Sequence, residues 1–269
     1  MKNEVTLRPS YWASVSGGKD SLYMLNLILH NLDIYPLDGV VHFEMEIDYP
    51  FIHTVIDYME ECCKKANIPF VRIKPSYSWI SMYEKYGFPT RKARWCNKLK
   101  IDANLQLENF MKSRGCYVVH YIGYCVDEEK RYKHKEGIKT ERYPLVEQGI
   151  MEDTILEWAK DQPIFNHYYE TQRRCGCMYC PMSSYISFAY LYKYYPENFD
   201  YMIGKMRETE VMRERELGRP FSCISSNPKY NADYLVHIIE TKWLKRLNDK
   251  ELENKQARSK WLDELLEDV

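Results

Sequence analysis

The stretch Tyr11–Leu32, YWASVSGGKDSLYMLNLILHNL, decides the fold of this chain. Its first five residues are apolar or small and are typical of a buried β-strand. The hydrophilic loop Ser16–Ser21, SGGKDS, follows directly. From Leu22 onward the apolar side chains recur at helical spacing, at Leu25, Ile28, Leu29 and Leu32. The sequence therefore predicts a strand, a short glycine-containing loop and a helix in direct succession.

The same alternation continues along the chain. Strands are predicted over Gly39–Phe43, Phe70–Ile73 and Cys116–Ile122, and helices over Ile52–Lys65, Lys98–Lys112 and Glu152–Lys160. Strands that alternate with helices of this length are typical of a parallel sheet covered by helices. We therefore expect an α/β fold with a Rossmann-like parallel sheet.

The chain changes character after about Pro163. No further β-patterned run follows, and helices are predicted over Ser184–Tyr195, Asp200–Glu216, Asn231–Asn248 and Lys250–Glu267. A helix that ends at a proline is a common boundary. We expect a nucleotide-binding α/β domain over residues 1–163 and a helical region over residues 164–269.

Composition limits the class of protein. The 269 residues carry a net charge of −1, so no overall positive field attracts nucleic acid. No run of 18 or more apolar residues appears, and the first residues lack the apolar segment of a secretory signal. The nine cysteines are an odd number, which disfavours a disulfide framework. These features predict a cytoplasmic protein without a membrane partner.

The chemistry of the SGGKDS loop favours a phosphate group. Paired glycines allow backbone N–H groups to close around an anion, the following helix adds its dipole, and Lys19 adds a positive charge. Ser16 and Ser21 can donate hydroxyl groups, and Asp20 suits Mg²⁺ or the start of a helix. The spacing matches neither the Walker loop nor the dinucleotide fingerprint. The alternative is a turn that only starts a helix.

Three cysteines, Cys175, Cys177 and Cys180, fall within one stretch of six residues, in a turn that contains Gly176 and is followed by Pro181. Thiolates at this spacing converge on a metal ion or cluster more readily than they pair as disulfides. Such a site needs a fourth ligand. Zinc and an iron–sulfur cluster both accept four cysteines, so spacing alone leaves the two open.

Ser16–Ser21 resembles the PP-loop of the N-type ATP pyrophosphatase superfamily, and within it the chain resembles the phosphoadenosine phosphosulfate (PAPS) reductase family. The resemblance spans about residues 9 to 200. Four further segments carry it: His42–Pro50, Arg94–Lys100, Gly123 with Asp127, Glu128 and Arg131, and Tyr143–Leu145. It implies that an adenine nucleotide, preferably ATP with Mg²⁺, binds residues 16–21, Gly123 and Arg131, and that Lys19 and Asp20 are catalytic.

The cysteines resemble those of the DNA phosphorothioation sulfurtransferases in this family. There, one cysteine in an R-W-C segment and a later cysteine group hold a [4Fe–4S] cluster. The resemblance implies the ligand set Cys96, Cys175, Cys177 and Cys180. A structural zinc ion and a metal-free thiol that carries sulfur are the alternatives.

The expected reaction is adenylation or sulfur transfer rather than sulfonucleotide reduction. Reductases of the family carry a catalytic cysteine in a tail of the E-C-G-L-H type, whereas no cysteine follows Cys223 in this sequence. Lys19 would stabilise the departing pyrophosphate, and nucleic acid is the first choice of acceptor. A sulfur-donor or complex partner protein is also expected. The alternatives are a PAPS or APS reductase with a different thiol, and a non-catalytic nucleotide-binding subunit with structural zinc.

Overall fold

The computed structural model describes residues 7–133 and 139–267, with side chains described as far as residue 257. The chain forms two compact units. The first contains Met1–Ser78 and Asn97–Phe165, and the second contains Trp79–Cys96 and Asn166–Val269. The segment Trp79–Cys96, which the sequence placed within the first domain, therefore packs with the C-terminal region.

The first unit is built on a five-stranded sheet in the order β3-β2-β1-β4-β5, and every neighbouring pair is parallel. This confirms the predicted α/β fold with its parallel sheet. β5 is a two-residue strand that the sequence did not indicate, because so short an edge strand has no recognisable pattern. The strands are β1 (Arg8–Val15), β2 (Gly39–Phe43), β3 (Phe70–Ile73), β4 (Cys116–Tyr121) and β5 (Glu141–Arg142).

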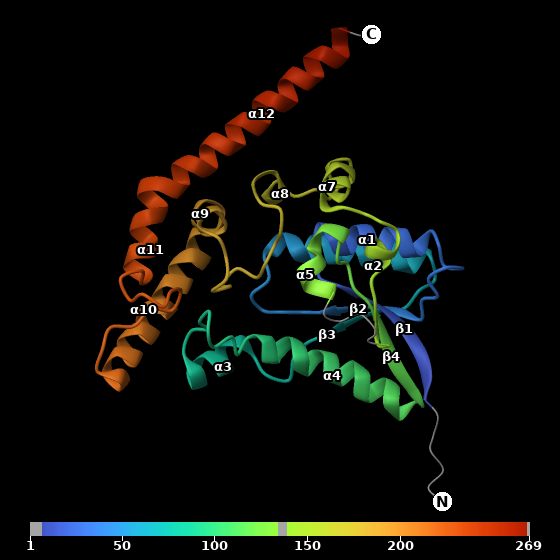
Figure 1. The fold of residues 1–269 in the computed structure, drawn as a ribbon, viewed down its shortest axis with the longest axis horizontal. Coiled ribbons are helices and arrows are strands. Elements are labelled where there is room, and N and C mark those ends of the chain that lie inside the picture. The colour runs from blue at the N-terminus through green and yellow to red at the C-terminus, as the bar shows by residue number, and fades with distance from the viewer. Residues whose placement is uncertain (1–6, 134–138, 268–269) are drawn as a thin grey trace, which may run out of the picture. The chain divides into compact units, whose positions relative to one another are not determined.

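Helices cover both faces of this sheet. α1 (Lys19–Leu29) and α2 (Pro50–Lys65) lie on one side, and α4 (Asn97–Ser113) lies on the other (Figure 1). Under α4, the side chains of Trp12, Val41, Leu107 and Val118 form one core cluster. Gly39 is required there, because a Cβ atom at this position would lie 2.6 Å from the Trp12 ring.

The strand order creates a switch point beside β1. The chain leaves β1 through α1 to β2 on one side, whereas β4 lies on the other side. In open α/β sheets, ligands bind outside the carboxyl ends of the strands at such a point. Four short helices follow β4 near this edge: η1 (Val126–Glu128), α5 (Glu129–Tyr132), α6 (Pro144–Glu147) and α7 (Glu152–Lys160).

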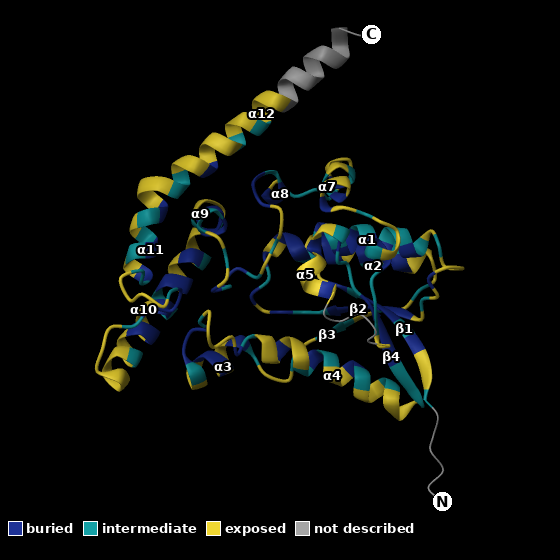
Figure 2. Cartoon of the chain, in the orientation of Figure 1, coloured by how far each residue is buried: buried dark blue, intermediate teal, exposed yellow. Residues whose placement is uncertain are grey.

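The second unit is helical, as predicted for the C-terminal region. Instead of two separate C-terminal helices, α11 (Ala232–Ile238) continues through a π-helical segment η3 (Ile239–Trp243) into α12 (Leu244–Glu267), most of whose described surface is exposed (Figure 2). The remaining helices are α3 (Trp79–Tyr86), α8 (Tyr168–Thr171), α9 (Tyr185–Tyr194) and α10 (Pro196–Leu217). No helix within the described ranges is long and apolar enough to cross a membrane.

Aromatic packing explains why residues 79–96 join this unit. The Trp79 ring lies 5.5 Å from the Tyr179 ring and 6.4 Å from the Tyr201 ring. The backbone N–H of Phe88 donates a hydrogen bond of 2.7 Å to the Thr209 hydroxyl on α10. Burial of large aromatic side chains is a strong stabilising contribution, so these contacts hold the segment in the helical unit.

Candidate functional site

The SGGKDS segment joins β1 to α1, as predicted: Ser16, Gly17 and Gly18 connect the two elements, and Lys19 begins the helix. Gly17 has a φ of +73°, and a Cβ atom there would lie 2.7 Å from the Ile52 side chain. Only glycine meets both conditions, because other residues are strained in the left-handed region. The N-cap residue of α1 is Gly18, which has no side chain to cap the helix. The loop therefore presents the amino end of a helix at the switch point, where an anion is stabilised.

Ser21 closes the loop internally. Its hydroxyl donates to the Gly18 carbonyl at 2.9 Å and accepts from the Ser16 backbone N–H at 3.2 Å. The Ser16 hydroxyl lies 3.4 Å from the same oxygen. Ser21 therefore shapes the loop, and its predicted contact with a bound nucleotide stays a prediction.

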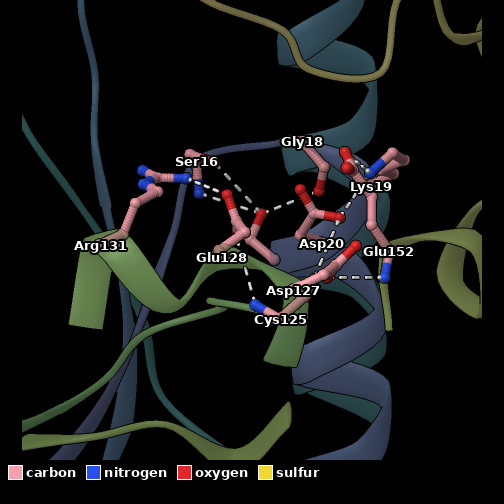
Figure 3. A network of polar contacts seen from close by, with 10 residues as sticks. Ser16, Gly18, Lys19, Asp20, Cys125, Asp127, Glu128, Arg131 and Glu152 are labelled. Carbon is pink, nitrogen blue, oxygen red and sulfur yellow. Dashed lines mark hydrogen bonds and ion pairs between the residues drawn. The ribbon is translucent and has the colours of Figure 1, made fainter. Parts of the chain in front are cut away.

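Lys19 is buried, with 3% of its surface exposed, and two carboxylates hold its ammonium group. Its Nζ lies 2.6 Å from Asp20 Oδ1 and 3.1 Å from Glu152 Oε1 (Figure 3). Glu152 is itself buried at the start of α7, and its backbone N–H donates to Asp127. Sequence reasoning missed Glu152 as a functional residue. The available signal was an acidic residue in the first turn of the helix after the Tyr143–Leu145 segment.

Asp20 lies in a largely desolvated position. Burial raises the pKa of Asp20 above its usual range, and the Lys19 ammonium acts in the opposite direction. The Cys125 thiol points to Asp20 Oδ1 at 3.9 Å. Burial, and then the Asp20 charge, raise the pKa of Cys125, so the sulfur stays a protonated donor.

Arg131 reaches the same region through Glu128. Its Nη1 donates to the buried Glu128 carboxylate at 2.6 Å, and its guanidinium lies 4.4 Å from the centre of the Tyr124 ring. Gly123 lets the end of β4 approach the loop, because a Cβ atom there would lie 3.1 Å from the Asp20 carbonyl oxygen. Loop, β4 end and α7 start thus meet in one polar network (Figure 3).

This network combines features that suit a phosphate chain with a divalent cation. Lys19 and Arg131 supply positive charge beside the amino end of α1, and Asp20, Asp127, Glu128 and Glu152 supply carboxylate oxygens. Phosphates bind the former, and Mg²⁺ binds carboxylates together with phosphate oxygens. The structure brings together all the predicted nucleotide-binding residues: Ser16, Gly17, Gly18, Lys19, Asp20, Ser21, Gly123 and Arg131.

All four predicted cysteine ligands belong to the second unit. Cys96 ends its first segment, and the other three lie in a turn in which Cys180 N–H donates to the Cys177 carbonyl at 3.2 Å. Burial raises the pKa of the Tyr168 hydroxyl, and the charges of Cys175 and Cys180 add to that effect. That hydroxyl donates to the Arg174 carbonyl at 3.2 Å.

The four thiols suit a metal centre in number and chemistry, and each is half-buried. As they are placed, however, no three His, Cys, Asp or Glu side chains of the described residues form a group that could hold a metal ion. The assignment of Cys96, Cys175, Cys177 and Cys180 to a metal centre therefore stays a prediction.

Comparisons with known proteins give limited similarity. No protein-family model matches the chain. An uncharacterized protein of Methanocaldococcus jannaschii, MJ0973, is 26% identical over 222 residues, which are 74% of this chain and 49% of that protein. Among solved structures, the chain is similar to the U34-tRNA thiolase NcsA from Methanococcus maripaludis with its [4Fe–4S] cluster, with 13% identity and a TM-score of 0.38 over 90% of this chain and 76% of that one. The chain spans about half the length of the curated relative that it matches.

Proposed function

We propose that this chain binds ATP with Mg²⁺ on its SGGKDS loop and uses it to adenylate an acceptor that then receives sulfur. The observation that carries this proposal is the buried Lys19 ammonium at the amino end of α1, at the switch point of a parallel sheet. A buried cation beside the positive end of a helix dipole suits a polyphosphate more than a single carboxylate or a neutral ligand.

In the proposed reaction, an acceptor oxygen attacks the α-phosphorus of ATP, and the bond between that phosphorus and the β-phosphate oxygen breaks. Pyrophosphate leaves, neutralised by Lys19, Arg131 and Mg²⁺. A sulfide-equivalent donor then displaces the adenylated oxygen, which departs as AMP. Each step forms one bond and breaks one, and no external reductant is required.

Lys19 must exchange partners for this chemistry. In the nucleotide-free protein its charge is shared by Asp20 and Glu152. When the β- and γ-phosphates approach, the ammonium turns to them, and the Asp20 carboxylate is released to ligate Mg²⁺, whereas Glu152 only competes for Lys19. Because the carboxylates and the phosphates compete for one cation, Glu152 sets the free-energy cost of nucleotide entry.

The cysteines of the second unit would hold the metal centre. We assign Cys96, Cys175, Cys177 and Cys180 to a [4Fe–4S] cluster, one cysteine for each iron, which when bound would hold the cysteine turn and the end of the segment Trp79–Cys96 together. Protein purified without oxygen should be brown and contain iron and sulfide. Cys180→Ser should lose that iron, whereas Cys116→Ser, in β4 of the first unit, should keep it. Colourless protein with one zinc ion per chain would refute the cluster assignment but not the nucleotide assignment.

Nucleotide binding is tested by equilibrium titration of the full chain with ATP and with AMP in the presence of Mg²⁺. Lys19→Gln should weaken ATP binding about 10- to 100-fold, since a charge-assisted hydrogen bond contributes about 1.5–3 kcal/mol. AMP binding should change little, because AMP lacks the β- and γ-phosphates. The matched control Lys65→Gln removes an exposed charge from the end of α2. Equal losses for ATP and AMP would contradict the proposed role of Lys19.

Two outcomes would redirect the proposal. Sulfite released from a labelled sulfonucleotide, without pyrophosphate release from ATP, would identify a sulfonucleotide reductase. Tight ATP binding with no turnover in the presence of tRNA, single-stranded DNA or sulfide would identify a nucleotide-binding subunit.

A further inference from the structure

A second surface with a defined chemical character lies on the helical unit, outside the nucleotide site. It consists of Arg91, Tyr185, Tyr230, Tyr234, Trp243 and Arg246, which we call the aromatic–basic surface. All four aromatic residues are half-buried, so part of each residue is accessible to solvent, and both arginines are exposed. None of these residues contributes to the predicted nucleotide or metal sites.

The rings of this surface contact one another in pairs. The centres of the Tyr185 and Trp243 rings lie 5.5 Å apart with a 30° tilt, and those of Tyr230 and Tyr234 lie 4.7 Å apart. Burial raises the pKa of Tyr185, and the charges of Tyr234 and Tyr230 add to that effect, so the second pair lies in the electrostatic neighbourhood of the first.

The backbone beneath Trp243 is unusual. Residues Ile239–Trp243 form a π-helical segment between α11 and α12, although both flanking helices are α-helical. A π-segment widens one turn of a helix and is rare compared with the α-helix. Where it does occur, it is frequently at a functional site. Here the wide turn ends at the tryptophan that meets Tyr185 from α9.

The charges around the rings are mainly positive. The Arg246 guanidinium lies 4.8 Å from the Trp243 ring centre, and the Lys242 ammonium lies 6.0 Å from it. Arg91 lies near Tyr185, whose pKa its charge lowers against the larger effect of burial. Two acids also border the surface, but Asp233 is paired with Arg207 at 2.7 Å, and Glu240 accepts a hydrogen bond from Tyr192.

Arg91 connects this surface to the cysteine turn. Its Nε donates to the Pro181 carbonyl at 3.2 Å, one residue after Cys180. A ligand that binds Arg91 therefore lies beside the turn that carries the predicted metal ligands.

We propose that the aromatic–basic surface binds single-stranded nucleic acid, with bases stacked on the exposed ring faces and phosphates on Arg91 and Arg246. Aromatic rings interleaved with basic side chains are the combination that recognises unpaired strands, because every base offers a stacking face and every linkage an anion. A duplex hides its base faces and would contact only the arginines. This inference deepens the proposed function, because it assigns the surface that binds a nucleic-acid acceptor. It rests on the proposed function only for the sulfur transfer to that acceptor, and not for the binding itself.

The test is fluorescence anisotropy of a labelled single-stranded RNA and DNA of about 15 nucleotides with the full chain, without ATP, from about 50 to 200 mM salt. Tyr185→Leu should weaken binding about 5- to 100-fold, whereas Tyr185→Phe should bind like the wild type, since it keeps the stacking ring. Arg91→Gln/Arg246→Gln should lower the slope of log affinity against log salt by about 1.4, because two phosphate contacts are removed. The matched control Lys65→Gln/Lys112→Gln removes two exposed charges from the first unit and should change neither quantity.

Several results would overturn this inference. One is that the wild type fails to bind the single strand at the lowest salt concentration. Another is that the wild type binds duplex and single strand with equal affinity. A third is that Tyr185→Leu and Tyr185→Phe weaken binding equally. Circular dichroism and thermal midpoints of each variant exclude loss of folding as the cause. Because Lys19→Gln is expected to lose ATP but keep the oligonucleotide, failure of this inference is separable from failure of the proposed nucleotide function.

Discussion

Replacing Glu152 with glutamine should make the protein less stable and its nucleotide site tighter. Both Glu152 and Lys19 are buried, and they are joined at 3.1 Å, so the substitution removes one of the two carboxylates that neutralise a desolvated ammonium. The nearly isosteric amide keeps an oxygen that can accept from Lys19. The change therefore tests charge rather than shape.

The expected magnitude follows from this geometry. At 3.1 Å, the Coulomb attraction between unit charges is about 5 kcal/mol for an effective dielectric constant of 20. Desolvation offsets much of it, and Asp20 still holds the ammonium at 2.6 Å. We expect a loss of about 2 kcal/mol in the free energy of unfolding, less than the 3–5 kcal/mol typical when a buried charge loses all its partners. This corresponds to a thermal midpoint lower by about 4–8 °C.

The nucleotide should respond in the opposite direction. Without the competing carboxylate, Lys19 turns to phosphate at lower cost, so ATP affinity should rise about 5- to 10-fold while AMP affinity stays the same. Thermal melts with and without Mg·ATP measure both effects. The matched control is Glu157→Gln on the same helix, which breaks an exposed pair with Lys160 and should cost at most about 0.5 kcal/mol. If Glu152→Gln behaves like this control, or if it weakens ATP binding, the partner exchange of Lys19 is wrong.

Two further predictions concern the loop backbone and acid stability. Gly17→Ala should lower the free energy of unfolding by more than about 2 kcal/mol and abolish ATP binding, because it combines backbone strain in the left-handed region with a 2.7 Å contact to Ile52. The control Gly115→Ala has a similar φ of +76° but open space around the new Cβ atom. It should cost only about 1 kcal/mol, measured for both variants by urea titration. Burial lowers the pKa of both His42 and His120, so they fold as neutral groups, and the unfolded chain takes up their protons first. The contribution of these two histidines to the free energy of unfolding should therefore be fully present above about pH 6.5 and decline as the pH falls toward 5. His120→Gln should flatten this decline, measured as the urea midpoint at each pH. An unchanged slope of urea midpoint against pH in this variant would contradict the prediction.

Local sequence pattern accounts for much of the fold. The β-patterned runs at β1, β2, β3 and β4 and the apolar periodicity of α1 and α2 follow from side-chain spacing alone, and all these elements form where they were predicted. A continuous apolar strand next to an amphipathic helix has few other stable solutions.

The sequence pattern predicted two parts of the chain, but it did not predict that Trp79–Cys96 belongs to the second. The segment Trp79–Cys96 lies between two elements of the α/β unit in sequence but belongs to the helical unit in space. Its destination depends on which aromatic surfaces it meets, such as Tyr179 and Tyr201 around Trp79. The π-helical turn before α12, whose last residue Trp243 packs on Tyr185, was not predicted either.

By itself the sequence determined the loop, its position between a strand and a helix, and the residues around it, because glycine geometry and hydrophobic periodicity act within a few residues. Only the tertiary structure decided that Lys19 is neutralised by Glu152, 133 positions away, and that Cys125 donates to Asp20. Likewise, it alone collected the aromatic–basic surface from four separate segments of the chain. Charge pairing in a buried site depends on distance through space, and that distance is set by how strands order themselves in the sheet and how helices pack on it.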